Sequence, residues 1–237
     1  VEFWPIIILT SYLVMHLLHL LYRMKRRLNS MKKNIIGIDF DNTIVSYDEL
    51  MHKVAVEQGW IDIHLEKDKK IIRDSIRLSI DGEVKWQRLQ ATVYGPRIGE
   101  AKLIDGVTQF FETCKKKSIQ TYIISHKTLY SNLGESQINL REAALGWMKQ
   151  HHFLNENGLG LNREQIFFES HRNEKALRAA ELQCTHFIDD LEETFLEPQF
   201  PEQTQKILFS PHLSETSLQE TMVVSSWDEI NQYFFNE

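Results

Sequence analysis

Two acidic residues, Asp39 and Asp41, stand one residue apart at the end of the apolar run IIGI, residues 35–38. Carboxylates this close repel each other, and burying either one costs several kcal/mol unless a cation or hydrogen-bond donors compensate. A chain that keeps both aspartates at the tip of an apolar strand is therefore expected to use them chemically. The rest of the sequence should supply their partners.

Polar side chains also follow other apolar runs of the chain. The run TYIIS ends in Ser125 and is followed closely by Lys127, and the run HFID leads into Asp189 and Asp190. Lys175 lies near the start of a predicted helix between these two runs. Because the carboxyl ends of neighbouring parallel strands meet at one crevice, we expect these side chains to lie close to the first two aspartates.

Two common sites for cations or phosphates do not fit the segment after the first apolar run. A calcium loop starting at Asp39 would need Gly at its sixth position and Glu at its twelfth, where the chain has Ile44 and Leu50. A phosphate-binding P-loop or dinucleotide fingerprint needs a Gly-rich turn after a strand, and none follows any predicted strand.

Four carboxylates from two strands suit a hard cation, Mg²⁺, which binds through oxygen and would relieve the repulsion between them. The hydroxyl of Ser125 and the ammonium group of Lys175 are then suited to hold a phosphoryl group, with Lys127 as the competing lysine. One aspartate can attack phosphorus, and a second can protonate the leaving oxygen and later activate water. This set of groups predicts phosphoryl-transfer chemistry.

The set resembles the haloacid dehalogenase (HAD) superfamily in its phosphatase branch, and the order and spacing of the motifs agree along residues 34–210. The first motif is IIGIDFDNT, the second TYIIS, the third the lysine of HRNEKALRAA and the fourth HFIDD. The resemblance implies a nucleophilic Asp39 and an acid/base Asp41 with its backbone carbonyl on the metal. The aspartate at position 41 favours a phosphatase, because dehalogenases of the superfamily lack it. The implied phosphate ligands are Thr43, Ser125 and Lys175, and the implied metal ligands are Asp39, Asp41, Asp189 and Asp190.

Apolar runs alternate with amphipathic stretches after residue 31, which predicts an α/β fold with a doubly wound, mainly parallel, Rossmann-like sheet. Ser226 and Glu229 fit a capping box at the start of the last helix. The predicted strands are 35–39, 121–125, 165–169, 186–189, 206–210 and 221–225, and the predicted helices include 106–118, 140–153 and 173–183.

Residues 46–100 interrupt this alternation with helical patterns, so we predict a small helical cap inserted into a core made of residues 31–45 and 101–237. The alternative is that these helices pack on the flank of the sheet. A cap that covers the site favours a small phosphorylated metabolite as substrate. The residues that could line its underside, or simply pack it, are Trp86, Arg88, Tyr94 and Arg97.

Residues 1–30 have a different character from the rest of the chain. Residues 4–22 contain no charged side chain and would span about 28 Å as a helix, close to the thickness of a hydrocarbon core. The basic cluster that follows would place the catalytic domain in the cytoplasm, tethered to the membrane. A disordered extension upstream of Met31, from a wrongly chosen start, and a packed helix are the alternatives.

The charge pattern and the cysteines narrow the function further. Residues 1–30 carry a net charge of +3 and the whole chain −6, so residues 31–237 carry −9, which argues against a nucleic-acid partner. Cys114 and Cys184 are expected to be reduced, as in cytosolic proteins. We predict a Mg²⁺-dependent phosphohydrolase, with a phosphotransferase or a catalytically silent binding module as the alternatives.

Overall fold

The computed structural model describes residues 33–131, 138–154, 157–211, 216 and 218–236. From residue 35 onward the described residues form one compact unit. The predicted membrane-spanning segment, residues 4–22, lies outside the described ranges. Within those ranges no helix has both the length and the apolar composition needed to cross a membrane.

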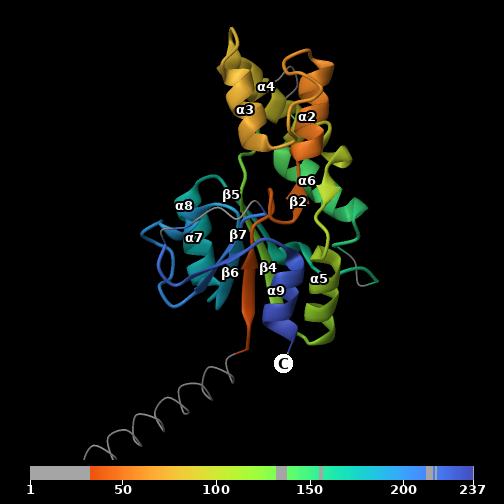
Figure 1. The fold of residues 1–237 in the computed structure, drawn as a ribbon. Coiled ribbons are helices and arrows are strands. Elements are labelled where there is room, and N and C mark those ends of the chain that lie inside the picture. The colour runs from red at the N-terminus through yellow and green to blue at the C-terminus, as the bar shows by residue number, and fades with distance from the viewer. Residues whose placement is uncertain (1–32, 132–137, 155–156, 212–215, 217, 237) are drawn as a thin grey trace, which may run out of the picture. The chain divides into compact units, whose positions relative to one another are not determined.

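Six parallel strands form the central sheet in the order β5-β4-β1-β6-β7-β8 (Figure 1). Ile38 of β1 pairs with Ile123 of β4 on one side and with Ile188 of β6 on the other. The strand order thus reverses at β1, where the carboxyl ends of three strands form the crevice typical of such sheets. The predicted doubly wound parallel sheet is confirmed. The strands are β1 (Ile35–Ile38), β4 (Gln120–His126), β5 (Ile166–Glu169), β6 (His186–Asp189), β7 (Gln205–Phe209) and β8 (Thr221–Val224).

Helices cover both faces of this sheet. Phe187 and Ile188 are neighbours on β6 and point into two different apolar cores, because successive side chains of a strand face opposite ways. Helices α5, α6 and α9 pack on the core that contains Ile188, and α7 and α8 pack on the core that contains Phe187. These helices are α5 (Val107–Lys116), α6 (Leu140–Gln150), α7 (Arg172–Glu181), α8 (Glu192–Phe195) and α9 (Trp227–Phe235).

Three further helices, which we call the cap helices, lie between β1 and β4 in the chain and beyond the carboxyl end of β1 in space (Figure 1). They are joined to the core through an antiparallel pair of two-residue strands, β2 and β3, which were not predicted from the sequence. The boundaries of a separate cap at residues 46 and 100 stay a prediction. The elements are β2 (Val45–Ser46), α2 (Asp48–Glu57), α3 (Lys69–Arg77), α4 (Gly82–Tyr94), a 3₁₀ turn (Ile98–Glu100) and β3 (Lys102–Leu103).

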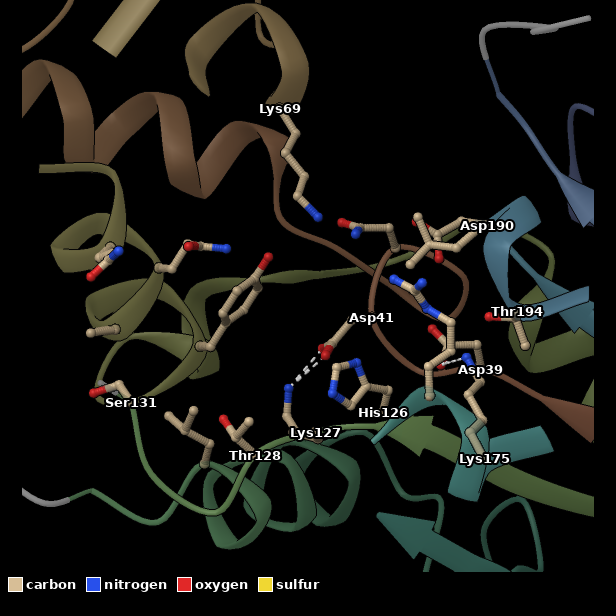
Figure 2. A pocket seen from close by; sticks show the side chains of 18 residues that line it. Asp39, Asp41, Lys69, His126, Lys127, Thr128, Ser131, Lys175, Asp190 and Thr194 are labelled. Carbon is tan, nitrogen blue, oxygen red and sulfur yellow. Dashed lines mark hydrogen bonds and ion pairs between the residues drawn. The ribbon is translucent and has the colours of Figure 1, made fainter. Parts of the chain in front are cut away.

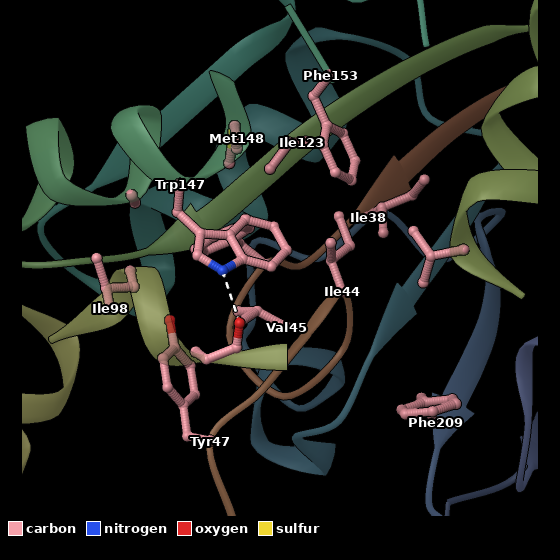
Figure 3. Packing of buried hydrophobic residues seen from close by; sticks show 14 of the residues in the cluster. Ile38, Ile44, Val45, Tyr47, Ile98, Ile123, Trp147, Met148, Phe153 and Phe209 are labelled. Atoms are coloured by element: carbon pink, nitrogen blue, oxygen red, sulfur yellow. Dashed lines mark hydrogen bonds between the residues drawn. The ribbon is translucent and has the colours of Figure 1, made fainter. Parts of the chain in front are cut away.

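A buried tryptophan contacts both the loop after β1 and the segment directly before β3. The Trp147 indole of α6 donates a 3.0 Å hydrogen bond to the carbonyl of Ala101, directly before β3 (Figure 3). Its ring meets the ring of Phe40 edge-on, with the centroids 5.5 Å apart. Phe40 is fully buried, so this packing holds the residue between the two aspartates in the core.

Candidate active site

The loop after β1 is held in one conformation by its own backbone. The amide of Asp39 donates to the carbonyl of Ile188 at 2.9 Å, which continues the pairing with β6 by one residue. The amide of Ile44 donates back to the carbonyl of Phe40 at 3.0 Å, and Asn42 has a positive φ of 59°. Asparagine tolerates this left-handed conformation better than most residues. The tight turn places both aspartates at the carboxyl edge of the sheet.

Lys175 of α7 lies between two of the predicted carboxylates. Its ammonium nitrogen is 2.6 Å from Oδ1 of Asp39 and 2.6 Å from Oδ2 of Asp189, and all three side chains are buried. Burial opposes the charged form of Lys175, but the two carboxylates outweigh it and raise its pKa above the ordinary value. Lys175 is therefore a fixed positive charge that holds Asp39 and Asp189 together.

The carboxylates near Lys175 outnumber it. Burial raises the pKa of Asp39 to about 7, and although Lys175 opposes this shift, Asp189 adds to it. Burial also raises the pKa of Asp190 well above its usual value, with further contributions from Asp39 and Asp189. Lys175 and Lys69 both oppose the shift at Asp190 but do not cancel it, so the site favours a further positive charge.

The arrangement of these three carboxylates fits a hard divalent cation. Asp39, Asp189 and Asp190 each offer one oxygen, and the three oxygens lie within 4.8 Å of one another. Carboxylate oxygens are the protein ligands that Mg²⁺ prefers, together with retained waters. The side chain of Asp41 is not part of this cluster, and a metal contact through its backbone carbonyl stays a prediction.

Asp41 has its own pair of partners. Its Oδ1 accepts a 2.6 Å hydrogen bond from the Tyr47 hydroxyl. The Lys127 ammonium lies 2.9 Å from Oδ1 and 2.7 Å from Oδ2 (Figure 2). The Lys127 side chain is only 3% exposed. The two lysines that the sequence left as competitors therefore contact different aspartates, Lys175 the first and Lys127 the second. Tyr47 was not predicted, because nothing in its sequence neighbourhood distinguishes it from a core aromatic residue.

A pocket of about 320 Å³ opens over these groups (Figure 2). Of the predicted site residues, four line it and three do not. Thr43, Ser125 and Asp189 are buried outside its lining, and the hydroxyl oxygens of the first two have no hydrogen-bond partner in the described part of the chain. Their predicted roles stay predictions. The four that line it are Asp39, Asp41, Lys175 and Asp190.

Two of the cap helices, α3 and α4, form the other side of the pocket. Of the four residues predicted for the cap's underside, only Tyr94 lines the pocket. Trp86 is buried in the core, Arg88 is exposed, and Arg97 forms ion pairs with Glu57 and Glu100. Several lining residues were missed because only the packing of helices over the sheet brings them there. These are Lys69 of α3, Gln87 and Gln90 of α4, and Arg172 at the start of α7.

No protein-family model matches the chain. No curated protein matches it in sequence either. Solved structures do match in fold. A family IA, variant 3 HAD hydrolase from Entamoeba histolytica is 13% identical, with a TM-score of 0.51 over 83% of this chain and 94% of its own.

Two further structures match to a similar extent. A dehalogenase is 10% identical, with a TM-score of 0.52 over 87% of this chain and 99% of its own. A HAD-family hydrolase from Deinococcus radiodurans, which has bound phosphate and sodium, is 14% identical, with a TM-score of 0.50 over 85% of this chain and 94% of its own. At these identities the likeness establishes the fold alone, and that fold is the one of the HAD-superfamily hydrolases.

Proposed function

We propose that the chain is a Mg²⁺-dependent phosphohydrolase that cleaves a phosphomonoester of a small metabolite through an aspartyl-phosphate on Asp39. The observation that carries this proposal is the separate pairing of the two aspartates, Asp39 with Lys175 and Asp41 with Lys127, at one pocket. The fold supports it, because the pairs lie at the carboxyl ends of the strands, where open α/β sheets bind their ligands.

Asp39 has the position that a nucleophile needs. Lys175 holds its Oδ1, so the side chain is fixed while the residue still lines the pocket. In the first step a bond forms between an Asp39 carboxylate oxygen and phosphorus, and the bond from phosphorus to the ester oxygen breaks. Mg²⁺ held by the three clustered aspartates would keep Asp39 ionised and offset the negative charge on the phosphoryl oxygens.

Asp41 serves as the proton donor and acceptor of the two steps. It protonates the leaving alkoxide in the first step and accepts a proton from the attacking water in the second, which releases phosphate and restores Asp39. Lys127 and Tyr47 fix its carboxylate toward the pocket. An alkoxide needs such a donor and a halide does not, so the presence of Asp41 favours phosphatase over dehalogenase chemistry.

The test is phosphate release by the full chain over a panel of phosphorylated metabolites, with Mg²⁺ or with EDTA. We expect turnover that requires Mg²⁺ and is lost in Asp39→Asn. Asp228→Asn is the matched control, because Asp228 is exposed on α9. Release that survives both EDTA and Asp39→Asn would contradict the proposal. Transfer of phosphate to an added alcohol in preference to water would identify a phosphotransferase. Binding of Mg²⁺ and ligand without turnover would identify a binding module.

A further inference from the structure

The pocket contains two cations that the proposed chemistry does not use. Lys175 is paired with Asp39, and Lys127 is paired with Asp41. Lys69 and Arg172 also line the pocket, yet neither forms an ion pair with a carboxylate anywhere in the described ranges. Two positive charges therefore line the pocket without an ion-paired carboxylate among the described residues.

Lys69 reaches the pocket from the cap. It is the first residue of α3, and its backbone amide donates to Asp48 Oδ1 at 3.2 Å, which fixes the start of the helix. Its side chain points into the pocket from the side opposite Lys175 (Figure 2). Burial opposes its charged form, but the neighbouring Tyr94 and Asp190 outweigh this and keep the pKa of Lys69 raised. Lys69 is thus a positive charge held away from the nucleophile.

Arg172 reaches the same pocket from the core. It is the first residue of α7, and its Nε is buried with no hydrogen-bond acceptor among the described residues. Buried donors in native proteins nearly always have a partner, and at a pocket wall the missing partner is a ligand atom or a water. Guanidinium groups suit carboxylates and phosphates in particular, so Arg172, as a residue of the pocket lining, suits an anionic ligand.

The pocket also has room for more than the group that reacts. Its volume of about 320 Å³ is at the lower end of the range for small-molecule sites. Gln87 and Gln90 of α4 line it beside Lys69, and their amides can bind hydroxyl or carboxylate oxygens. The cap side of the pocket is therefore a polar surface for the part of a substrate that lies beyond the reacting phosphoryl group.

We propose, building on the phosphohydrolase function above, that the substrate carries a second anionic group, a carboxylate or a second phosphate, and that Lys69 and Arg172 bind it. The positions of the two lysines assign one anionic group of the substrate to each end of the pocket. Lys175 lies at the nucleophile and suits the reacting phosphoryl group, whereas Lys69 enters from the cap helices. The alternative is that Lys69 only balances the charge of Asp190. In that case the loss of Lys69 would weaken the binding of all substrates equally.

Matched substrate pairs separate these two roles. Glucose 1,6-bisphosphate is compared with glucose 1-phosphate, and 3-phosphoglycerate with glycerol 3-phosphate, so that the arms distinguish a second phosphate from a carboxylate. For the full chain with Mg²⁺, the measured quantity is the ratio of kcat/KM within each pair. The same ratios are measured as affinities by calorimetry in the Asp39→Asn protein, which does not depend on turnover.

We expect the member with the second anion to be preferred about tenfold or more in at least one pair, as for one retained charged hydrogen bond. Lys69→Met should reduce that ratio about tenfold, Arg172→Met should reduce it in the same direction, and Lys69→Arg should restore part of it. Lys70→Met is the control, because Lys70 is the exposed next residue of α3 and does not line the pocket. Circular dichroism and melting temperatures check that each variant is folded.

The outcomes keep the two proposals apart. A binding preference that depends on Lys69, without phosphate release, would support this inference and contradict the phosphohydrolase proposal. Mg²⁺-dependent phosphate release with no preference in any pair, or with a ratio that Lys69→Met leaves unchanged, would overturn this inference and leave the hydrolase standing. Equal weakening of both members of each pair by Lys69→Met would show the charge-balancing role instead.

Discussion

Lys127 contacts both carboxylate oxygens of Asp41, at 2.9 Å and 2.7 Å, from a side chain that is almost completely buried. This pairing fixes the second aspartate of the loop independently of the first, which is held by Lys175. Each carboxylate therefore has its own cation, as expected if one acts as nucleophile and the other transfers protons. The division of roles can be tested through the leaving group.

Asp41→Asn should slow the hydrolysis of alkyl phosphates about 10²–10⁴-fold, the usual contribution of a positioned proton donor. With 4-nitrophenyl phosphate the first step should be nearly unaffected, because nitrophenolate leaves without a proton. The second step still needs a base, so we expect a burst of about one equivalent of nitrophenolate followed by slow turnover. Stopped-flow absorbance measures the burst. Equal losses for both substrates, with no burst, would count against a proton-transfer role.

Binding of Mg²⁺ should become tighter as the pH rises toward 7. In the metal-free fold the pKa of Asp39 is raised to about 7, so below that pH the cation must displace a proton from the site. Each unit below pH 7 should therefore cost at least about tenfold in affinity, because Asp190, whose pKa is also raised, adds to the protons that the cation displaces. Calorimetry at pH 5.5, 6.5 and 7.5 gives the slope.

Asp190→Asn provides the variant for this measurement. It removes one of the three clustered carboxylates and should weaken Mg²⁺ binding at every pH. Asp228→Asn, on the exposed side of α9, should not change it. An affinity independent of pH across this range would show that the cation does not bind at Asp39.

A site residue could be predicted from the sequence where the strand pattern itself places it at the site. Asp39, Asp41 and Asp190 were found because they follow apolar strands, and parallel strands bring their carboxyl ends to one edge. Lys69 and Arg172 were missed because they come from helix starts whose position over the sheet is a matter of tertiary packing. Neither carries a spacing or a periodicity that separates it from a surface residue.

The elements show the same division. The six long strands of the sheet were predicted to within a residue or so, whereas β2, β3 and α8 were not, because two to four residues show no period. The capping box at α9 forms only in part. Ser226 accepts from the Glu229 amide, but the Glu229 carboxylate accepts from the amide of Ser225 rather than that of Ser226. The sequence spacing predicts the N-terminal capping of α9, but the loop geometry determines which backbone amide the Glu229 carboxylate accepts from.

Lys175→Met should lower the stability of the metal-free protein strongly. It removes the only cation seen in contact with Asp39 and Asp189 in the described structure, and breaking a buried pair in this way costs about 3–5 kcal/mol. Adding Mg²⁺ should then recover more stability than it does in the wild type, because the cation replaces the lost charge. Urea unfolding with EDTA or with Mg²⁺ measures both effects.

Lys149→Met is the control for this experiment, since Lys149 is exposed on α6 and its loss should change the free energy of unfolding by less than about 0.5 kcal/mol. If Lys175→Met were as stable as the wild type in EDTA, Asp39 and Asp189 would not depend on this ammonium group. If Mg²⁺ stabilised both proteins equally, the cation and Lys175 would not share the same carboxylates.

His186, at the start of β6, should make the fold sensitive to mild acid. Burial lowers its pKa to about 4, and its ring packs against Phe234 with the centroids 4.9 Å apart. In the unfolded chain an ordinary histidine binds a proton near pH 6.5. The unfolded state therefore binds more protons than the folded state between about pH 6.5 and 4, so His186 costs stability as the pH falls through this range.

His186→Gln keeps a neutral polar side chain and removes the titration. Relative to the wild type, its free energy of unfolding should therefore increase as the pH is lowered from 7 to 4.5, whatever the difference at pH 7. His64→Gln is the control for the substitution itself, because His64 is exposed between α2 and α3. Urea unfolding at each pH gives the curves. Parallel curves for His186→Gln and wild type would mean that the His186 ring is protonated within the fold, and the packing of α9 on this edge of the sheet would then tolerate a charge.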